Sequence, residues 1–281
     1  MNQLVSLISP CWNGELYLPA FLECVKEQTY RPLEFILVDD GSTDGTAEIC
    51  KQLFPKLEEA GVHTVYIYQE HAGQATAVDR ALRVFQGEYL AWADSDDYLH
   101  PDNISLKVEY LDNHPDIGLV RNNANHLQDG MLSEGIAKSD EKCDMDLFET
   151  LLLEKTYVYA GCYMMRRSLF FACYPEGRIP LSAVGQNLQL LLPAASRSIC
   201  GYVDQVLMTY QIHSDSHAFR SRNLKEQYER IEGFRVLLQE LEPYCAVDPL
   251  KYQKLVDEKC TKLKKRLMYM LALHHRSVKE P

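Results

Sequence analysis

The chain has 281 residues, of which 46% are hydrophobic and 25% are charged, with a formal net charge of −11 and a pI near 5.3. This composition is that of a globular protein with one large domain, alone or with a small appendage, and it excludes a disordered chain. The acidic balance argues against a nucleic-acid binder, and no apolar run reaches the roughly 18 residues of a membrane span.

The cysteines and the N-terminus point to the cytoplasm. The nine cysteines are scattered and form no Cys-x-x-Cys pair, which is typical of small buried side chains in a reducing compartment and not of a disulfide or zinc framework. The apolar run at residues 4–8 lacks a basic flank and is too short for a signal peptide.

Short apolar runs alternate with helical periodicity through the first hundred residues. Runs at 4–9, 35–38, 64–68 and 89–93 predict four strands, and apolar residues at helical spacing predict a helix after each of the first three. This alternating order predicts a parallel sheet with right-handed crossovers.

The second half of the chain is less regular. A helix is expected from Pro101, and Asp129-Gly130 predicts a turn in a polar hairpin or loop. The remaining predictions are strands at 117–120 and 157–165, helices near 147–152 and over 186–195, and extended segments at 201–203 and 207–213.

From about residue 221 the chain becomes charged and helical, with interruptions near Pro243 and Pro249. The last helix carries six Lys or Arg and no acid between Lys259 and Arg276. Two interpretations stay open: a basic amphipathic helix that touches an anionic membrane surface, or a helix packed on its own chain or on a second subunit with a solvated basic face.

The fourth predicted strand stops at Asp94, Asp96 and Asp97. In an open parallel sheet, ligands bind at the carboxyl ends of the strands. Carboxylates this close repel one another, so the cluster favours either a bound cation or a solvated loop.

These aspartates belong to an ordered set of motifs at 10–13, 28–30, 38–46 and 91–97, which strongly resembles the GT-A-fold glycosyltransferases of family 2. The resemblance covers residues 4–215. It implies an α/β, Rossmann-type, mostly parallel sheet flanked by helices, here with a C-terminal helical extension. The implied domains are 1–220, made of a nucleotide-binding half (1–123) and an acceptor half (124–220), and the extension at 221–281.

The resemblance also implies how a nucleotide diphosphate-sugar is held. Asp96 matches the metal-ligating carboxylate, and Asp94 and Ser95 lie beside it near the ribose or metal. The expected cofactor is Mn²⁺ or Mg²⁺, which stabilises the charge of the leaving diphosphate as a Lewis acid. His213, in a Tyr-x-x-His-x-x-Ser signature, matches a further metal ligand, although a lone His is more often an ordinary surface or core residue.

The nucleobase is assigned to the ends of the first two strands. Asp40 matches an aspartate that accepts the uracil imide hydrogen, with Asp39 adjacent; the alternative is that both only cap the next helix. Pro10, Trp12 and Asn13 match the motif that walls the base, where Trp12 replaces a more usual tyrosine but can stack equally well.

Gly73 and Gln74 match the segment that closes over base and ribose. This segment lacks the basic residue that some relatives carry there, which leaves the choice of nucleotide open.

The main departure lies at Gln186 and Asn187, where inverting members carry Glu-Asp and use a carboxylate as the base. An amide cannot take a proton at physiological pH. Three explanations stay open: another carboxylate such as Glu176 supplies the base, the acceptor needs no strong base, or the chain binds donor without transferring sugar.

The working hypothesis is therefore a cytoplasmic, metal-dependent glycosyltransferase. It would use a nucleotide diphosphate-sugar, first of all a UDP-sugar, to extend a cell-envelope polysaccharide or glycolipid, with inversion as the family expectation. The alternative is a catalytically silent donor-binding or scaffold subunit. A nucleotidyltransferase is disfavoured because no Gly-rich, Lys/Arg-containing triphosphate loop follows the first strand.

Overall fold

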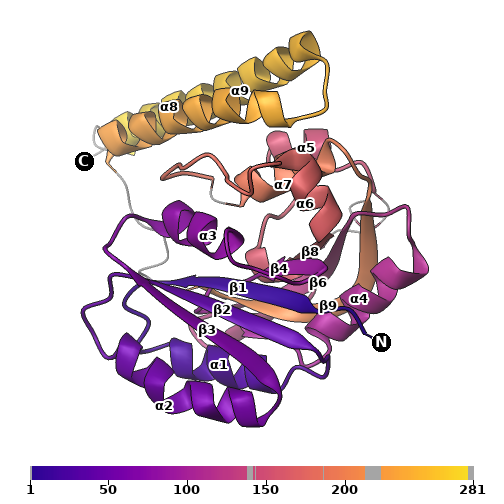
Figure 1. Ribbon diagram of the computed structural model, residues 1–281. Helices are drawn as coiled ribbons and strands as arrows, with labels where there is room; N and C mark the ends of the chain where they lie inside the picture. The colour runs from indigo at the N-terminus through magenta and orange to yellow at the C-terminus, as the bar shows by residue number, and fades with distance from the viewer. Residues whose placement is uncertain (1, 138–141, 143, 186, 213–222, 278–281) are drawn as a thin grey trace.

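The computed structural model is described for residues 2–137, 142, 144–185, 187–212 and 223–277. Its centre is a nine-stranded sheet in the order β3-β2-β1-β4-β8-β6-β9-β5, with β7 paired to β6 (Figure 1). The strands are β1 (Val5–Cys11), β2 (Leu33–Asp40), β3 (Val62–Gln69), β4 (Tyr89–Trp92), β5 (Tyr98–Leu99), β6 (Leu119–Gln128), β7 (Met131–Ser133), β8 (Tyr163–Arg166) and β9 (Cys200–Ile212).

The first half is the parallel layer that the alternating pattern predicts, because β3, β2, β1 and β4 run parallel to one another. Every residue of β2 is buried, as expected for a strand covered on both faces. Helices α1 (Leu18–Lys26) and α2 (Thr46–Glu59) cover one face, and α3 (Gln74–Leu82) lies on the other (Figure 1). The register pairs Cys11 with Asp39, so the carboxyl ends of β1 and β2 meet at one edge.

The second half makes the sheet mixed. Strand β8 is antiparallel to both β4 and β6, while β6 and β9 are parallel. The predicted turn at Asp129-Gly130 is confirmed: both residues have positive φ (51° and 77°) and join β6 to β7. Helices α4 (Asn103–Asn113), α5 (Phe148–Leu152), α6 (Arg167–Cys173) and α7 (Leu188–Ala195) complete this half.

Two expected strands were wrong in extent. The strand predicted over 157–165 begins only at Tyr163, after a 3-10 turn at Ala160–Cys162, where the Gly161 carbonyl accepts hydrogen bonds from the side chains of Asn103 and Lys107. The two extended segments predicted at 201–203 and 207–213 belong to the single strand β9. The register between β9 and β6 shifts at residues 122–124 of β6, and residues 204–206 of β9 are exposed there.

The C-terminal extension consists of α8 (Leu224–Leu241) and α9 (Pro249–Ser277), joined through a 3-10 turn at Glu242–Tyr244. The two helices lie side by side above α5 and α7 (Figure 1). Their apolar side chains belong to the same buried core as the sheet, including Phe234, Leu238 and Val256. No helix in the described part of the chain has the length and apolar character needed to cross a bilayer.

Candidate functional site

The carboxylates after β4 lie at the edge where the parallel strands end. Asp94, Ser95 and Asp96 are half-buried, and Asp97 is buried. Asp94 Oδ1 accepts a hydrogen bond of 2.8 Å from Gln74 Nε2 at the start of α3. Burial and the neighbouring Asp96 carboxylate raise the pKa of Asp94 to about 7.

Asp97 ties this segment to β9. Its Oδ1 accepts a 3.0 Å hydrogen bond from the backbone N–H of Gln211, whereas Oδ2 is buried without a hydrogen-bond partner among the described residues. Burial, followed by the charges of Asp94 and Asp96, raises the pKa of Asp97 well above its usual range. A buried oxygen without a donor beside two more carboxylates is a site that a cation would stabilise.

The oxygen chemistry of Asp94, Asp96 and Asp97 fits Mn²⁺ or Mg²⁺, which both prefer oxygen ligands. Within the described ranges, however, no group of three or more His, Cys, Asp or Glu side chains is arranged to hold a metal by itself. The predicted ligand His213 lies outside the described residues. The phosphate oxygens of a donor would therefore have to complete the coordination of an ion held by Asp94 and Asp96.

At the end of β2, Asp39 and Asp40 are both buried and fully engaged. Asp39 accepts hydrogen bonds from the Ser42 N–H (2.8 Å) and the Tyr66 hydroxyl (2.6 Å). The interpretation that the two aspartates only cap α2 is wrong, because it is Asp44 that accepts from the N–H of the first helical residue.

Asp40 organises the 69–73 segment. Its Oδ1 accepts from Gln69 Nε2 (2.6 Å) and the Ala72 N–H (2.8 Å), and its Oδ2 accepts from the Gly73 N–H and lies 2.9 Å from His71 Nδ1. These contacts use all of the roughly four lone-pair positions of a carboxylate. A uracil imide hydrogen would have to replace one of them.

Trp12 forms an exposed aromatic platform above this edge. Its side chain is 51% exposed, and its ring lies 4.7 Å from that of His71. Asn13, with φ 51°, fixes the loop: its N–H donates to Ser42 Oγ and its Oδ1 accepts from the Thr43 N–H. Pro10, half-buried within β1, lies beneath this loop.

Gly73 and Gln74 connect the two ends of the site. Gly73 directly precedes the first residue of α3. Its φ of 92° is a backbone conformation that residues with a side chain rarely adopt. This turn places its N–H on Asp40 and the Gln74 amide on Asp94. The structure thus brings the predicted base-side and metal-side residues into one continuous network.

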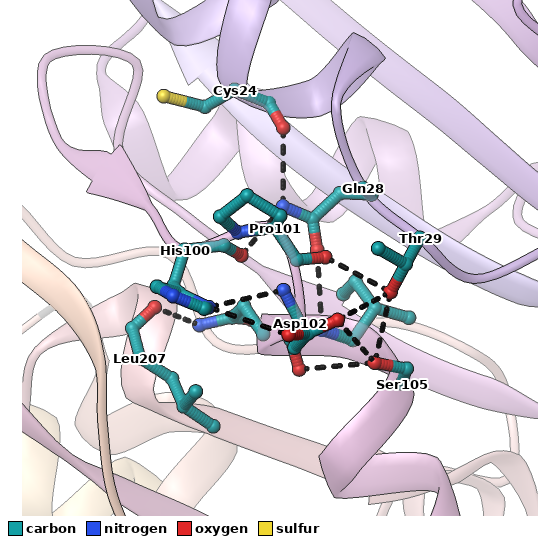
Figure 2. Close-up of polar contacts among 10 residues, drawn as sticks. Cys24, Gln28, Thr29, His100, Pro101, Asp102, Ser105 and Leu207 are labelled. Atoms are coloured by element: carbon teal, nitrogen blue, oxygen red, sulfur yellow. Dashed lines mark hydrogen bonds and ion pairs between the residues drawn. The ribbon is translucent and has the colours of Figure 1, made fainter.

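The motif at residues 28–30 supports the carboxylate segment from below. Figure 2 shows the Gln28 side chain donating to the carbonyl oxygens of Cys24 and His100, at 3.1 and 2.9 Å. Thr29 donates to Asp102 Oδ1 at 2.8 Å. These contacts fasten the chain that follows the aspartates to the end of α1, which explains a motif with no apparent chemistry of its own.

Asn187, at the position of the expected base, is used as an amide. Its Nδ2 donates to the Val158 carbonyl at 2.8 Å, and its Oδ1 accepts from Trp92 Nε1 at 3.2 Å. Trp92 is the last residue of β4, so Asn187 joins the start of α7 to the strand that carries the aspartates. Gln186 lies outside the described residues.

Glu176 is exposed in the turn after α6. This turn is held against α3, because the buried Asp79 accepts from the Ile179 N–H and lies 3.4 Å from Arg178 Nε. No described contact joins Glu176 to the aspartates of β4, so its role as a base stays a prediction.

Three rings lie near the contacts of Asn187 and Asp97. Tyr159 follows Val158, Tyr210 precedes Gln211, and His126 packs against both tyrosines. Of the three, sequence patterns included only Tyr210, as the tyrosine of the Tyr-x-x-His-x-x-Ser signature. Tyr159 stacks on Tyr210 with ring centroids 4.4 Å apart, and its hydroxyl lies 2.8 Å from His126 Nε2. The pairing of β6 with β9 sets His126 opposite Tyr210, and the pairing of β6 with β8 brings the chain before β8, which holds Tyr159, to the same place.

Comparison with known proteins agrees with this geometry. The model of the family described as glycosyl transferase family 2 matches residues 6–171. The chain belongs to this family. The match includes the strand-end aspartates and stops before Asn187 and α7.

Among relatives of the family, TuaG of Bacillus subtilis, whose name assigns it provisionally to teichuronic acid biosynthesis, is 39% identical over 108 residues. That match covers 38% of this chain and 42% of TuaG, so the chain spans less than half of that relative.

Solved structures share the GT-A fold. Staphylococcus aureus TarS, in complex with UDP-GlcNAc, has a TM-score of 0.66 at 16% identity, over 91% of this chain and 71% of that one. The mannosyltransferase PcManGT of Pyrobaculum calidifontis, in complex with GDP-Man and Mn²⁺, has a TM-score of 0.62 at 17% identity, over 97% and 76%. The predicted α/β fold with a mostly parallel sheet and a C-terminal helical extension is thus confirmed.

Proposed function

We propose that the chain is a metal-dependent glycosyltransferase that transfers a sugar from a nucleotide diphosphate-sugar, with a UDP-sugar as the first candidate. The observation that carries the proposal is the carboxylate edge after β4, where Asp97 Oδ2 is buried beside Asp94 and Asp96 and no described residue donates to it. Four of the solved structures that share the fold of this chain are complexes with UDP, UDP-GlcNAc or GDP-Man, and two of the four also hold Mn²⁺.

In this proposal each part of the network has one task. Asp94 and Asp96 would hold a divalent ion, whose positive charge would stabilise the leaving diphosphate. Trp12 stacks the base, and the Asp40-supported 69–73 segment borders it. The acceptor approaches from the side of Asn187 and Tyr159, and attack from there, opposite the diphosphate, gives inversion.

The acceptor belongs to the cell envelope, as a polysaccharide or a lipid-linked saccharide. TuaG supports this choice through its name. The C-terminal helices offer a route to such an acceptor, because Met268 and Tyr269 on α9 are exposed next to the cationic Lys265 and Arg266. They would place the protein at the inner membrane surface or in a homodimer, which vesicle flotation and light scattering distinguish.

Calorimetry with UDP and Mn²⁺ tests donor binding. We expect Asp96→Asn to weaken Mn²⁺-dependent UDP binding by about 10-fold or more, because an amide loses the charge that holds the ion. Asp116→Asn, at an exposed position after α4, is the matched control and should bind like the parent. If the parent binds no UDP with or without metal, the proposal is wrong.

The alternative, a silent donor-binding or scaffold subunit, is favoured by the engagement of Asn187 as an amide. It predicts the same UDP binding but no turnover. Measuring UDP release from UDP-sugars in Mn²⁺ separates the two, because only an enzyme releases UDP faster than the protein-free control.

A further inference from the structure

The structure leaves the attacking hydroxyl without a carboxylate base at the usual position. Asn187 carries no acidic group, and both ends of its amide are engaged, by Val158 and by Trp92. The group that removes the acceptor proton must nevertheless lie near this position, on the side of the sugar away from the diphosphate.

Tyr159 occupies this place. It follows directly on Val158, whose carbonyl binds the Asn187 amide. On its other side its ring stacks on Tyr210, and the next residue of β9, Gln211, donates its N–H to Asp97. Tyr159 therefore lies between the position of the usual base and the carboxylate end of β4, and its half-buried side chain leaves part of its surface accessible.

His126 gives the Tyr159 hydroxyl a proton acceptor. Its Nε2 is 2.8 Å from the Tyr159 oxygen, and its ring packs edge-on against both Tyr159 and Tyr210. Stacking of Tyr157 on the far side of Tyr159, at 6.0 Å, holds the ring in place. The contacts fix the hydroxyl and the imidazole relative to each other, as a proton relay requires.

The protonation states suit this arrangement. Burial, with smaller contributions from Cys162 and Asp97, raises the pKa of Tyr159 to about 12, so its hydroxyl keeps its proton at neutral pH. Burial lowers the pKa of His126, so its imidazole is neutral there. Tyr159 can thus take a proton only while it passes its own to His126.

We propose that Tyr159, backed by His126, accepts the proton of the attacking acceptor hydroxyl in place of the missing carboxylate; this inference rests on the proposed function. The acceptor oxygen bonds to the anomeric carbon while its proton moves to the Tyr159 oxygen. The Tyr159 proton moves to Nε2 of His126, which needs the tautomer protonated on Nδ1. The bond from the anomeric carbon to the diphosphate breaks, and its electron pair leaves with the nucleotide. The imidazolium then returns the proton to solvent.

Tyr159→Phe and His126→Gln test the relay in the full-length protein. Phe keeps the stacked ring, and Gln can hydrogen-bond to the Tyr159 hydroxyl but cannot take its proton. UDP release from UDP-glucose and UDP-GlcNAc in Mn²⁺ should fall by about 10²-fold in each variant, while the Kd for UDP stays unchanged. The double variant should be no slower than the slower single one, because both residues serve one step.

Chemical rescue separates proton transfer from structure. His126→Ala should recover UDP release when imidazole is added, and Tyr159→Phe should not. His114→Ala and Tyr228→Phe, at exposed positions on α4 and α8, are the matched controls and should keep the parental rate.

Several results would overturn the relay. Losses that multiply in the double variant, an unchanged rate in His126→Gln, or a raised Kd for UDP that accounts for the loss would each assign these residues another role. A parent that binds UDP but releases none would also overturn the relay, while leaving donor binding intact. Only a parent that binds no UDP would overturn the proposed function as well.

Discussion

Replacement of Asn187 by aspartate restores the carboxylate that relatives carry, and the structure predicts that it destabilises the protein. Asn187 Nδ2 donates to the Val158 carbonyl at 2.8 Å. An ionised aspartate has no hydrogen-bond donor. One of its oxygens would face the Val158 carbonyl, which would lose the donor that it has in the parent protein. Leaving a partly buried acceptor unsatisfied costs about 1–3 kcal/mol. The contact with Trp92 Nε1 survives, because a carboxylate oxygen also accepts.

At about 2–4 °C per kcal/mol, the value for chains of 150–250 residues, this cost lowers the Tm by roughly 2–12 °C. Urea unfolding and calorimetry measure it directly. Asn113→Asp, an exposed site at the end of α4, is the matched control and should cost only about 0.3–1 kcal/mol, from the helix dipole.

The same variant separates the mechanisms. If Tyr159 and His126 accept the proton, Asn187→Asp should not raise the rate of UDP release. A variant as stable as the parent that releases UDP at least about 10-fold faster would refute our account of Asn187 as a fixed amide. If the parent releases no UDP and Asn187→Asp does, the result would favour the interpretation of the chain as a silent scaffold subunit.

Two further predictions concern the base platform and the core. Trp12→Ala should weaken UDP binding by about 5- to 150-fold, because stacking on an aromatic ring contributes about 1–3 kcal/mol, with little change in Tm at this exposed site; calorimetry checks both. Burial lowers the pKa of Lys107 from 10.5 to about 7, so the unfolded chain binds more protons above pH 7 and stability rises with pH. From pH 6.5 to 8.5 this rise in the free energy of unfolding is about 2 kcal/mol, and urea unfolding should show no such rise in Lys107→Met. The Gly161 carbonyl keeps its hydrogen bond from Asn103 in that variant. An equal rise in parent and variant would contradict the burial argument.

Local patterns predicted the first half of the fold well, because β1, β2 and β4 are almost wholly buried and each helix carries an apolar stripe. The chain around Gly161 could not be predicted in this way. Tyr157, Tyr159 and Tyr163 have the β propensity of a strand, but side chains of Asn103 and Lys107 take the backbone carbonyl that a strand would use. That competition arises from contacts about fifty residues away.

The candidate site likewise contains residues that local sequence could place and residues that only the folded chain brings together. Asp94, Asp96 and Asp40 could be placed at one edge of the sheet because Asp40 ends the buried strand β2 and the other two come within four residues of the end of the buried strand β4. His126 and Tyr159 are 33 residues apart and meet only at 2.8 Å in the folded chain. No spacing rule links them, since their approach depends on the antiparallel pairing of β6, which carries His126, with β8, which Tyr159 precedes.

The network around the aspartates shows why donor and acceptor functions can diverge in this family. Asp40 and Gln74 tie the donor side to α3, whereas Asn187 ties the last residue of β4 to the acceptor half. Under the proposed function, an amide at 187 therefore keeps the geometry of the donor site while it removes the charge expected to activate an acceptor. Such a chain can change the group that accepts the proton without changing the metal site. Tyr159, which contacts His126, lies one residue beyond Val158. Its use as the proton acceptor requires no rearrangement of the aspartates.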